Sequence, residues 1–125
     1  MAVQPIDIHI HPFTEEACLG HGPSFTEAHY GFFGKSPDAP HHGKQYITID
    51  ETYRHFKESG IDKAVIVNMV SYNRWGRALP NDYLGQYARK YPDMFIPFAG
   101  VAPHMGPPAL REIERAVKEL GCKGL

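Results

Sequence analysis

The segment 5–12, PIDIHIHP, constrains the fold of this chain more than any other part of it. Apolar and polar residues alternate in it, and this period of two predicts a β-strand. Successive side chains of a strand point to opposite faces, so Asp7, His9 and His11 are expected to share one face. The three isoleucines are then expected on the other face. Pro12 cannot donate a ladder hydrogen bond, so the strand is expected to end beside the two histidines.

The pair His9 and His11 is predicted to bind a metal ion. Two neutral imidazoles one pleat apart can reach one divalent ion at normal metal–nitrogen distances. The C-terminal end of a strand is also where enzymes with parallel sheets keep their chemistry. The alternative is an incidental pair on an ordinary strand, but three ionisable residues on one face are poorly suited to core packing. Two imidazoles suit zinc best, with manganese, iron and cobalt as alternatives.

Size and composition indicate one domain, residues 1–125, with a hydrophobic core of its own. The formal net charge is −1 with both signs interspersed, which gives no footprint for nucleic acid or for a membrane surface. The longest apolar run, residues 64–70, is too short to span a bilayer, and no secretory signal is visible. Cys18 and Cys122 have no zinc or redox spacing, so we expect reduced thiols in a cytoplasmic protein.

Residues 13–47 are predicted to form a long loop on the side of the histidines, because Gly, Pro, His and aromatic residues dominate them. Such a loop is either a lid over the site or a mobile surface excursion. A helix is predicted to follow, with Thr48 and Glu51 as a capping box and Gly60 as the end. The almost wholly apolar run 64–70 predicts a buried strand of a parallel sheet.

The second half of the chain repeats this order of helix and strand. A helix opening at Pro80 or Asn81 carries a tyrosine row that we interpret as packing, and residues 95–101 predict a third strand. A third helix begins at Pro107, and residues 122–125 predict the start of a fourth strand. Alternating units of this kind predict an α/β fold with a parallel sheet and right-handed crossovers. About three βα units are present, and a complete eight-fold barrel typically needs about 250 residues.

The chain resembles the N-terminal part of the amidohydrolase superfamily, most closely the branch of aminocarboxymuconate semialdehyde decarboxylase and related metal-dependent hydrolases. The residues that carry the resemblance lie in four segments: 6–11, 79–82, 91–95 and 109–121. The resemblance implies a partial (β/α)₈ TIM barrel with a divalent metal, usually zinc, held in part by His9 and His11. It also implies that the remaining ligands and the acid/base residues come from later strands, so no catalytic residue is identifiable in this sequence.

The loops after the second and third strands supply candidates for substrate binding. Arg74, Arg77 and His104 could meet a carboxylate, and Trp75 could stack on an unsaturated ring, although a solvated surface role remains the alternative for the arginines. We expect the N-terminal portion of an enzyme that hydrolyses an ester, lactone or amide-like bond, or decarboxylates a small carboxylated substrate. The portion alone is expected to be inactive.

The second hypothesis is a self-associating half-barrel or metal-binding module, because uncovered strand edges are templates for another strand. We therefore expect a homo-oligomer or association with the missing barrel half.

Overall fold

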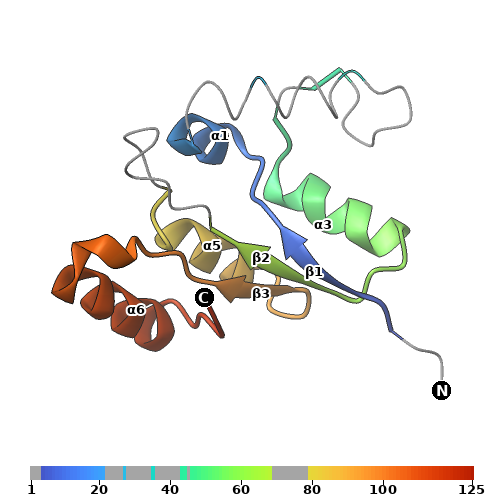
Figure 1. The fold of residues 1–125 in the computed structure, drawn as a ribbon. Coiled ribbons are helices and arrows are strands. Elements are labelled where there is room, and N and C mark those ends of the chain that lie inside the picture. The colour runs from blue at the N-terminus through green and yellow to red at the C-terminus, as the bar shows by residue number, and fades with distance from the viewer. Residues whose placement is uncertain (1–3, 22–26, 28–34, 36–42, 45, 69–78) are drawn as a thin grey trace.

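The computed structural model describes residues 4–21, 27, 35, 43–44, 46–68 and 79–125, which form a parallel sheet with helices (Figure 1). The described strands are β1 (Ile6–Ile10), β2 (Lys63–Val67) and β3 (Phe95–Phe98), adjacent in that order. The described helices are α1 (Glu15–His21), α3 (Ile49–Glu58), α5 (Asp82–Lys90) and α6 (Pro107–Glu119), with a 3₁₀ turn η2 (Pro103–Met105). The predicted α/β fold with a parallel sheet is confirmed.

Strand β1 is irregular, and the prediction of a strict alternation along it is wrong. Asp7 lies beside Ala64 and Ile10 lies beside Ile66, so three steps along β1 match two steps along β2. The extra residue places Asp7 and Ile10 on the same face as two fully buried residues of β2. The isoleucines therefore do not share a face: Ile10 packs against the core, whereas Ile6 and Ile8 are 53% and 76% exposed.

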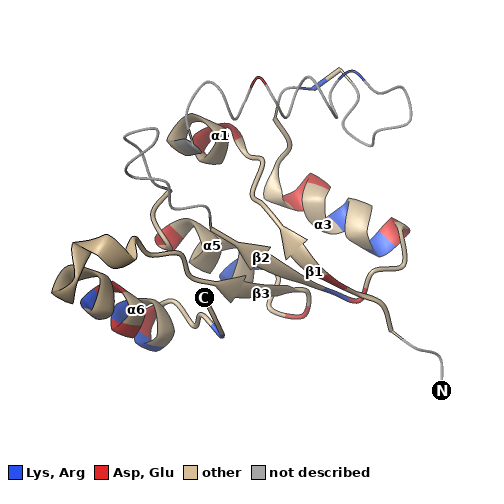
Figure 2. Ribbon diagram, in the orientation of Figure 1, with Lys and Arg blue, Asp and Glu red and all other residues tan. Residues whose placement is uncertain are grey.

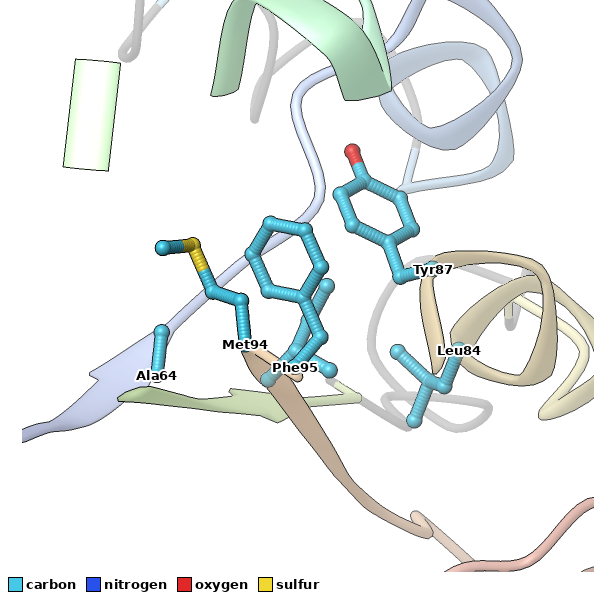
Figure 3. Packing of buried hydrophobic residues seen from close by; sticks show 6 residues of the cluster. Ala64, Leu84, Tyr87, Met94 and Phe95 are labelled. Atoms are coloured by element: carbon cyan, nitrogen blue, oxygen red, sulfur yellow. The ribbon is translucent and has the colours of Figure 1, made fainter. Parts of the chain in front are cut away.

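The main core fills the space between the sheet and helices α3 and α5 (Figure 3). Phe95 meets the rings of Phe56, Tyr87 and Tyr91 edge to face, with centroids 6.4, 5.1 and 6.3 Å away. Leu84 and Met94 are fully buried in the same cluster. The tyrosine row of α5 thus serves packing, as predicted.

The other face of the sheet carries accessible apolar side chains. Val65, Val67 and Ile96 are only partly buried there, and Ile6 lies beside Lys63 on the same face. Figure 2 shows that Asp, Glu, Lys and Arg gather on helices α3, α5 and α6, whereas the strands are mostly without charge. This face of the sheet is therefore mostly apolar among the described residues.

The segment 13–47 is not a plain loop where the structure describes it. Helix α1 begins at Glu15, and Ala17 packs against Leu79 and Tyr83 near the start of α5. It follows β1 directly, at the same end of the sheet as the histidines (Figure 1). Most of the remaining segment, and with it the lid hypothesis, lies outside the described residues.

The predicted boundaries of helix α3 are confirmed by their local hydrogen bonds. The Thr48 hydroxyl accepts from the Glu51 backbone N–H at 3.1 Å, and the Glu51 carboxylate accepts from the Thr48 backbone N–H at 2.8 Å. Gly60 follows the helix with a φ of 74°, which a residue with a Cβ adopts only under strain. The whole sequence signature of this helix is thus present in the structure.

Replacing Thr48 by alanine is expected to lower the free energy of unfolding by about 1 kcal/mol, because one N-terminal N–H loses its acceptor. Urea unfolding at neutral pH measures the change, and Thr48→Ser is the control because serine keeps the hydroxyl. A Thr48→Ala chain as stable as the Ser variant would show that the cap contributes nothing.

The third helix and the start of a fourth strand match the prediction, whereas β3 ends at Phe98 and not at the predicted residue 101. Pro97 lies inside β3 without interrupting its pairing with β2. Its carbonyl points away from β2 and accepts from the Lys123 N–H. The nitrogen of Pro97 lies on that same side, so the N–H that proline lacks is not needed for the ladder to β2. Phe98 pairs in parallel with Gly124. Gly121, with a φ of 73°, follows the C-cap residue of helix α6. None of the described helices has the length and apolar character needed to cross a bilayer.

Candidate metal-binding site

His9 and His11 converge at the C-terminal end of strand β1. Their Nε2 atoms are 3.1 Å apart, and their ring centroids are 4.9 Å apart with the planes at 85°. The ring of His9 is exposed and that of His11 is partly buried. The predicted pair therefore presents two imidazole nitrogens to one point in space.

The tautomer of His11 is set by a backbone carbonyl of the neighbouring strand. His11 Nδ1 lies 3.2 Å from the oxygen of Val67, the last residue of β2. A carbonyl oxygen only accepts, so Nδ1 carries the proton and a neutral His11 has its lone pair on Nε2. His9 Nε2–H then donates to His11 Nε2. Burial lowers the pKa of His11, the Val67 hydrogen bond opposes this, and the neighbouring His9 adds to the lowering.

Asp7 shapes the backbone beneath the pair. Its Oδ1 atom accepts a hydrogen bond from the backbone N–H of His9 at 3.0 Å. This bond falls within the irregular part of β1, where the His9 N–H has no regular ladder position. Asp7 thereby stabilises the irregular backbone at His9 through a local hydrogen bond.

The two nitrogens fit a divalent ion. Ligands about 2.1 Å from one ion and 3.1 Å apart subtend about 95° at it, between octahedral and tetrahedral angles. A hydrogen bond from Nδ1 to a carbonyl is the usual arrangement that orients a ligating histidine. No group of three or more His, Cys, Asp or Glu side chains suited to a metal occurs among the described residues. His9 and His11 therefore form an incomplete ligand set within this part of the chain.

The predicted substrate-binding residues are only partly visible. Arg74, Arg77 and Trp75 lie outside the described residues. His104 is exposed on the 3₁₀ turn η2, which follows β3. It does not form a three-residue metal group with the two histidines in the described part of the chain. Its predicted role in binding a carboxylate stays a prediction.

A buried polar cluster at the same end of the sheet was not predicted. Asn81, 3% exposed, occupies the N-cap position of α5, but its side chain does not cap the helix. It binds Asn68 after β2, Gly100 after β3 and Glu112 on α6. The only sequence signals were one polar residue, Asn68, within the apolar run 64–70 and an asparagine before a helix, and neither identifies a partner.

Arg115 closes this cluster from the outside. It makes a bidentate pair with Asp82 at 3.0 and 2.7 Å and binds both carboxylate oxygens of Glu112 at 2.8 Å. The Arg115 guanidinium holds the pKa values of the Asp82 and Glu112 carboxyl groups below their usual range. The cluster therefore joins helix α5 to helix α6 through three charged side chains.

Lowering the pH is expected to weaken the fold partly through this cluster. Because the folded pKa values of Asp82 and Glu112 are depressed, their contribution is present above the unfolded values of about 3.9 and 4.3 and is lost as pH falls below them. Exposure limits the effect to about 1 kcal/mol. Urea midpoints between pH 7 and 3 are expected to fall less in Arg115→Met than in Lys118→Met. If the urea midpoints of the two variants fall equally between pH 7 and 3, the cluster of Asp82, Glu112 and Arg115 does not cause the loss of stability.

Comparison with known proteins identifies the family. A family model described as amidohydrolase matches residues 6–125, nearly the whole chain. The chain therefore belongs to the amidohydrolase family. No curated protein matches it. The predicted resemblance is confirmed at this level.

Solved structures share the fold. A 5-carboxyvanillate decarboxylase from Novosphingobium aromaticivorans is 26% identical with a TM-score of 0.66, and the match covers 99% of this chain and 41% of that one. A dihydroxybenzoic acid decarboxylase from Polaromonas sp. JS666 is 26% identical with a TM-score of 0.61, covering 98% and 37%. An uncharacterised TIM-barrel protein from Bordetella bronchiseptica, 19% identical with a TM-score of 0.64 and covering 96% and 42%, supports the fold alone.

These comparisons place the sheet in a barrel. The chain spans about two fifths of the length of the solved structures that it matches, so its strands and helices correspond to part of a (β/α)₈ barrel. Both decarboxylases were solved with bound manganese, one with 3-methoxy-4-hydroxy-5-nitrobenzoic acid and the other with the inhibitor 2-nitroresorcinol. A divalent metal is thus supported, whereas the expected preference for zinc receives no support.

Proposed function

We propose that this chain provides two metal ligands, His9 and His11, of an amidohydrolase-family enzyme that removes carbon dioxide from small carboxylated phenols. The observation that carries the proposal is the 3.1 Å approach of the two Nε2 atoms, with the His11 tautomer set by Val67. Manganese is the favoured ion, because the two decarboxylases that the chain matches at 26% identity contain it. Hydrolysis of an ester, lactone or amide-like bond is the runner-up within the same family.

The residues of this chain bind and orient. His11, held by Val67, presents a fixed Nε2 lone pair, and His9 becomes a ligand when its proton moves from Nε2 to Nδ1. A divalent ion held there supplies Lewis-acid attraction for the oxygens of a carboxylated phenol. The group that would protonate the ring carbon as carbon dioxide leaves is not identified among the described residues, so the chain alone is expected to be inactive.

Ligand-observed NMR tests the proposal in solutions that contain Mn²⁺ and a molar excess of the protein over Mn²⁺. A phenol with an ortho carboxylate, 5-carboxyvanillate, is expected to relax faster in the presence of the Mn²⁺-loaded chain than guaiacol, which lacks both carboxylates. The difference is expected to vanish in a His9→Ala/His11→Ala chain. Equal relaxation of both compounds, or an unchanged difference in the double variant, would overturn the proposal.

The exposed apolar face supports self-association as a second candidate. Ile8 and Ile6 on strand β1 are largely exposed, and the face beyond them is apolar and partly accessible. A second copy that covers this face would bury apolar area and pair an open strand edge. Light scattering after size-exclusion chromatography is expected to show a dimer or larger species, reduced in Ile8→Lys and retained in Leu110→Lys, an exposed site on α6. A monomer at all concentrations would contradict it.

A further inference from the structure

The side-chain amide of Asn68 is anchored just beyond the end of strand β2. Its Nδ2 atom donates to the carbonyl oxygen of Leu79 at 2.6 Å and to Oδ1 of Asn81 at 3.0 Å. Both hydrogens of the amide are thereby used. The Leu79 carbonyl only accepts, so a flipped amide would place two oxygens together. The orientation of the Asn68 side chain is thus determined by its partners.

Asn81 makes this anchor rigid, because all four of its hydrogen-bonding positions are filled. Its Oδ1 accepts from Asn68 and from the Gly100 backbone N–H at 2.9 Å. Its Nδ2 donates to the Gly100 carbonyl at 3.0 Å and to Glu112 at 2.9 Å. Any shift of the Asn81 side chain would leave one of these buried groups unpaired, so its position is fixed by its four hydrogen bonds.

This network lies one peptide bond from the acceptor of His11. The carbonyl of Val67 belongs to the same peptide plane as the N–H of Asn68, so anchoring the Asn68 side chain restrains the movement of that peptide. We propose that Asn68 is a positioning residue for the His9–His11 pair: through Asn81 it holds the Val67 carbonyl where it accepts from His11 Nδ1. The importance of this role for metal binding rests on the proposed function. The hydrogen bond between His11 and Val67 is present in the metal-free chain.

The position of Asn68 makes this role specific. Ala64 to Val67 are held by the ladders to β1 and β3, whereas Asn68 follows the last described ladder residue of β2. Without a side-chain anchor the last peptide of a strand frays, and Val67 is the last residue. The Oδ1 atom of Asn68 is buried and has no donor among the described residues, so the anchor described here consists of its two donated bonds.

Replacing Asn68 by leucine tests the proposal, with Thr52→Val as the matched control. Leucine keeps the approximate size and removes both donated bonds. Thr52 is buried, and its hydroxyl donates to the Thr48 carbonyl at 2.9 Å, so the control removes a side-chain hydrogen bond away from the histidines. Asn68→Ser is the second variant, because its hydroxyl keeps one donor and adds no apolar bulk.

Two measurements on the 125-residue chain decide the outcome. Long-range ¹H–¹⁵N correlation spectra without metal are expected to show His11 as the Nδ1–H tautomer in the wild type and in Thr52→Val, and as a tautomer mixture in Asn68→Leu. The affinity for Mn²⁺, measured by calorimetry, is expected to fall roughly 10-fold in Asn68→Leu, less in Asn68→Ser and not in the control.

A folded Asn68→Leu chain with the wild-type tautomer and Mn²⁺ affinity would overturn the inference. If both Asn68 variants fail to fold, Asn68 serves the fold as a whole and the inference is overturned as well. A wild-type chain that binds no Mn²⁺ would instead overturn the proposed function, and the metal-free tautomer would still decide the role of Asn68.

Discussion

Replacing His11 by alanine is expected to lower the affinity of the chain for Mn²⁺ more than 100-fold. The change removes one of two converging nitrogens, and the loss of a direct ligand costs more than the 10- to 100-fold typical of residues that only orient ligands. His9→Ala is expected to have a similar effect, because neither imidazole alone provides a chelating pair. Calorimetric titration with Mn²⁺ measures both affinities.

The control is His55→Ala, which removes a histidine from helix α3, where it lies against Phe56. Its Mn²⁺ affinity is expected to equal that of the wild type. If His55→Ala and His11→Ala weaken binding equally, the ion binds histidines at random on the surface. Such a result would remove the metal site from this end of the sheet.

Replacing Phe95 by alanine is expected to destabilise the fold by about 3–5 kcal/mol. Phe95 is 2% exposed and meets three aromatic rings, from α3, from α5 and from the C-cap residue of α5, so its removal leaves a cavity between the sheet and both helices. A domain of this size is stable by only about 5–15 kcal/mol, so the variant is expected to be partly unfolded at 37 °C. Urea unfolding followed by circular dichroism measures the change.

Val117→Ala provides the comparison, because Val117 is 52% exposed on helix α6. It is expected to change the free energy of unfolding by less than about 0.5 kcal/mol. A Phe95→Ala chain that loses less than about 1 kcal/mol would mean that the cluster shown in Figure 3 is not the main core of this fold.

Local signals in the sequence were sufficient for most of the elements. Helix α3 begins at the capping box of Thr48 and Glu51 and ends before Gly60. These signals act through local hydrogen bonds and one backbone angle, so their spacing alone predicts the helix. Helix α1 was missed because glycines and prolines dominate the segment 13–47, although Glu15 and Glu16 provide an acidic first turn. Composition averaged over a long segment concealed a two-turn helix within it.

The candidate site was predictable only in part. The spacing of His9 and His11 indicates that their rings can meet, and the structure brings them together. The irregular pairing of β1 could not be predicted, because alternation within one strand contains no information about the register of its neighbour. The contacts of Val67 and Asn81 join segments distant in the sequence and depend on the assembled sheet.

Anomalous diffraction at the manganese absorption edge, from crystals of the chain grown with Mn²⁺, tests the central claim most directly. We predict one anomalous peak about 2.1 Å from Nε2 of both His9 and His11, at the C-terminal end of strand β1. Rings turned away from each other, or manganese bound only at other positions, would contradict it.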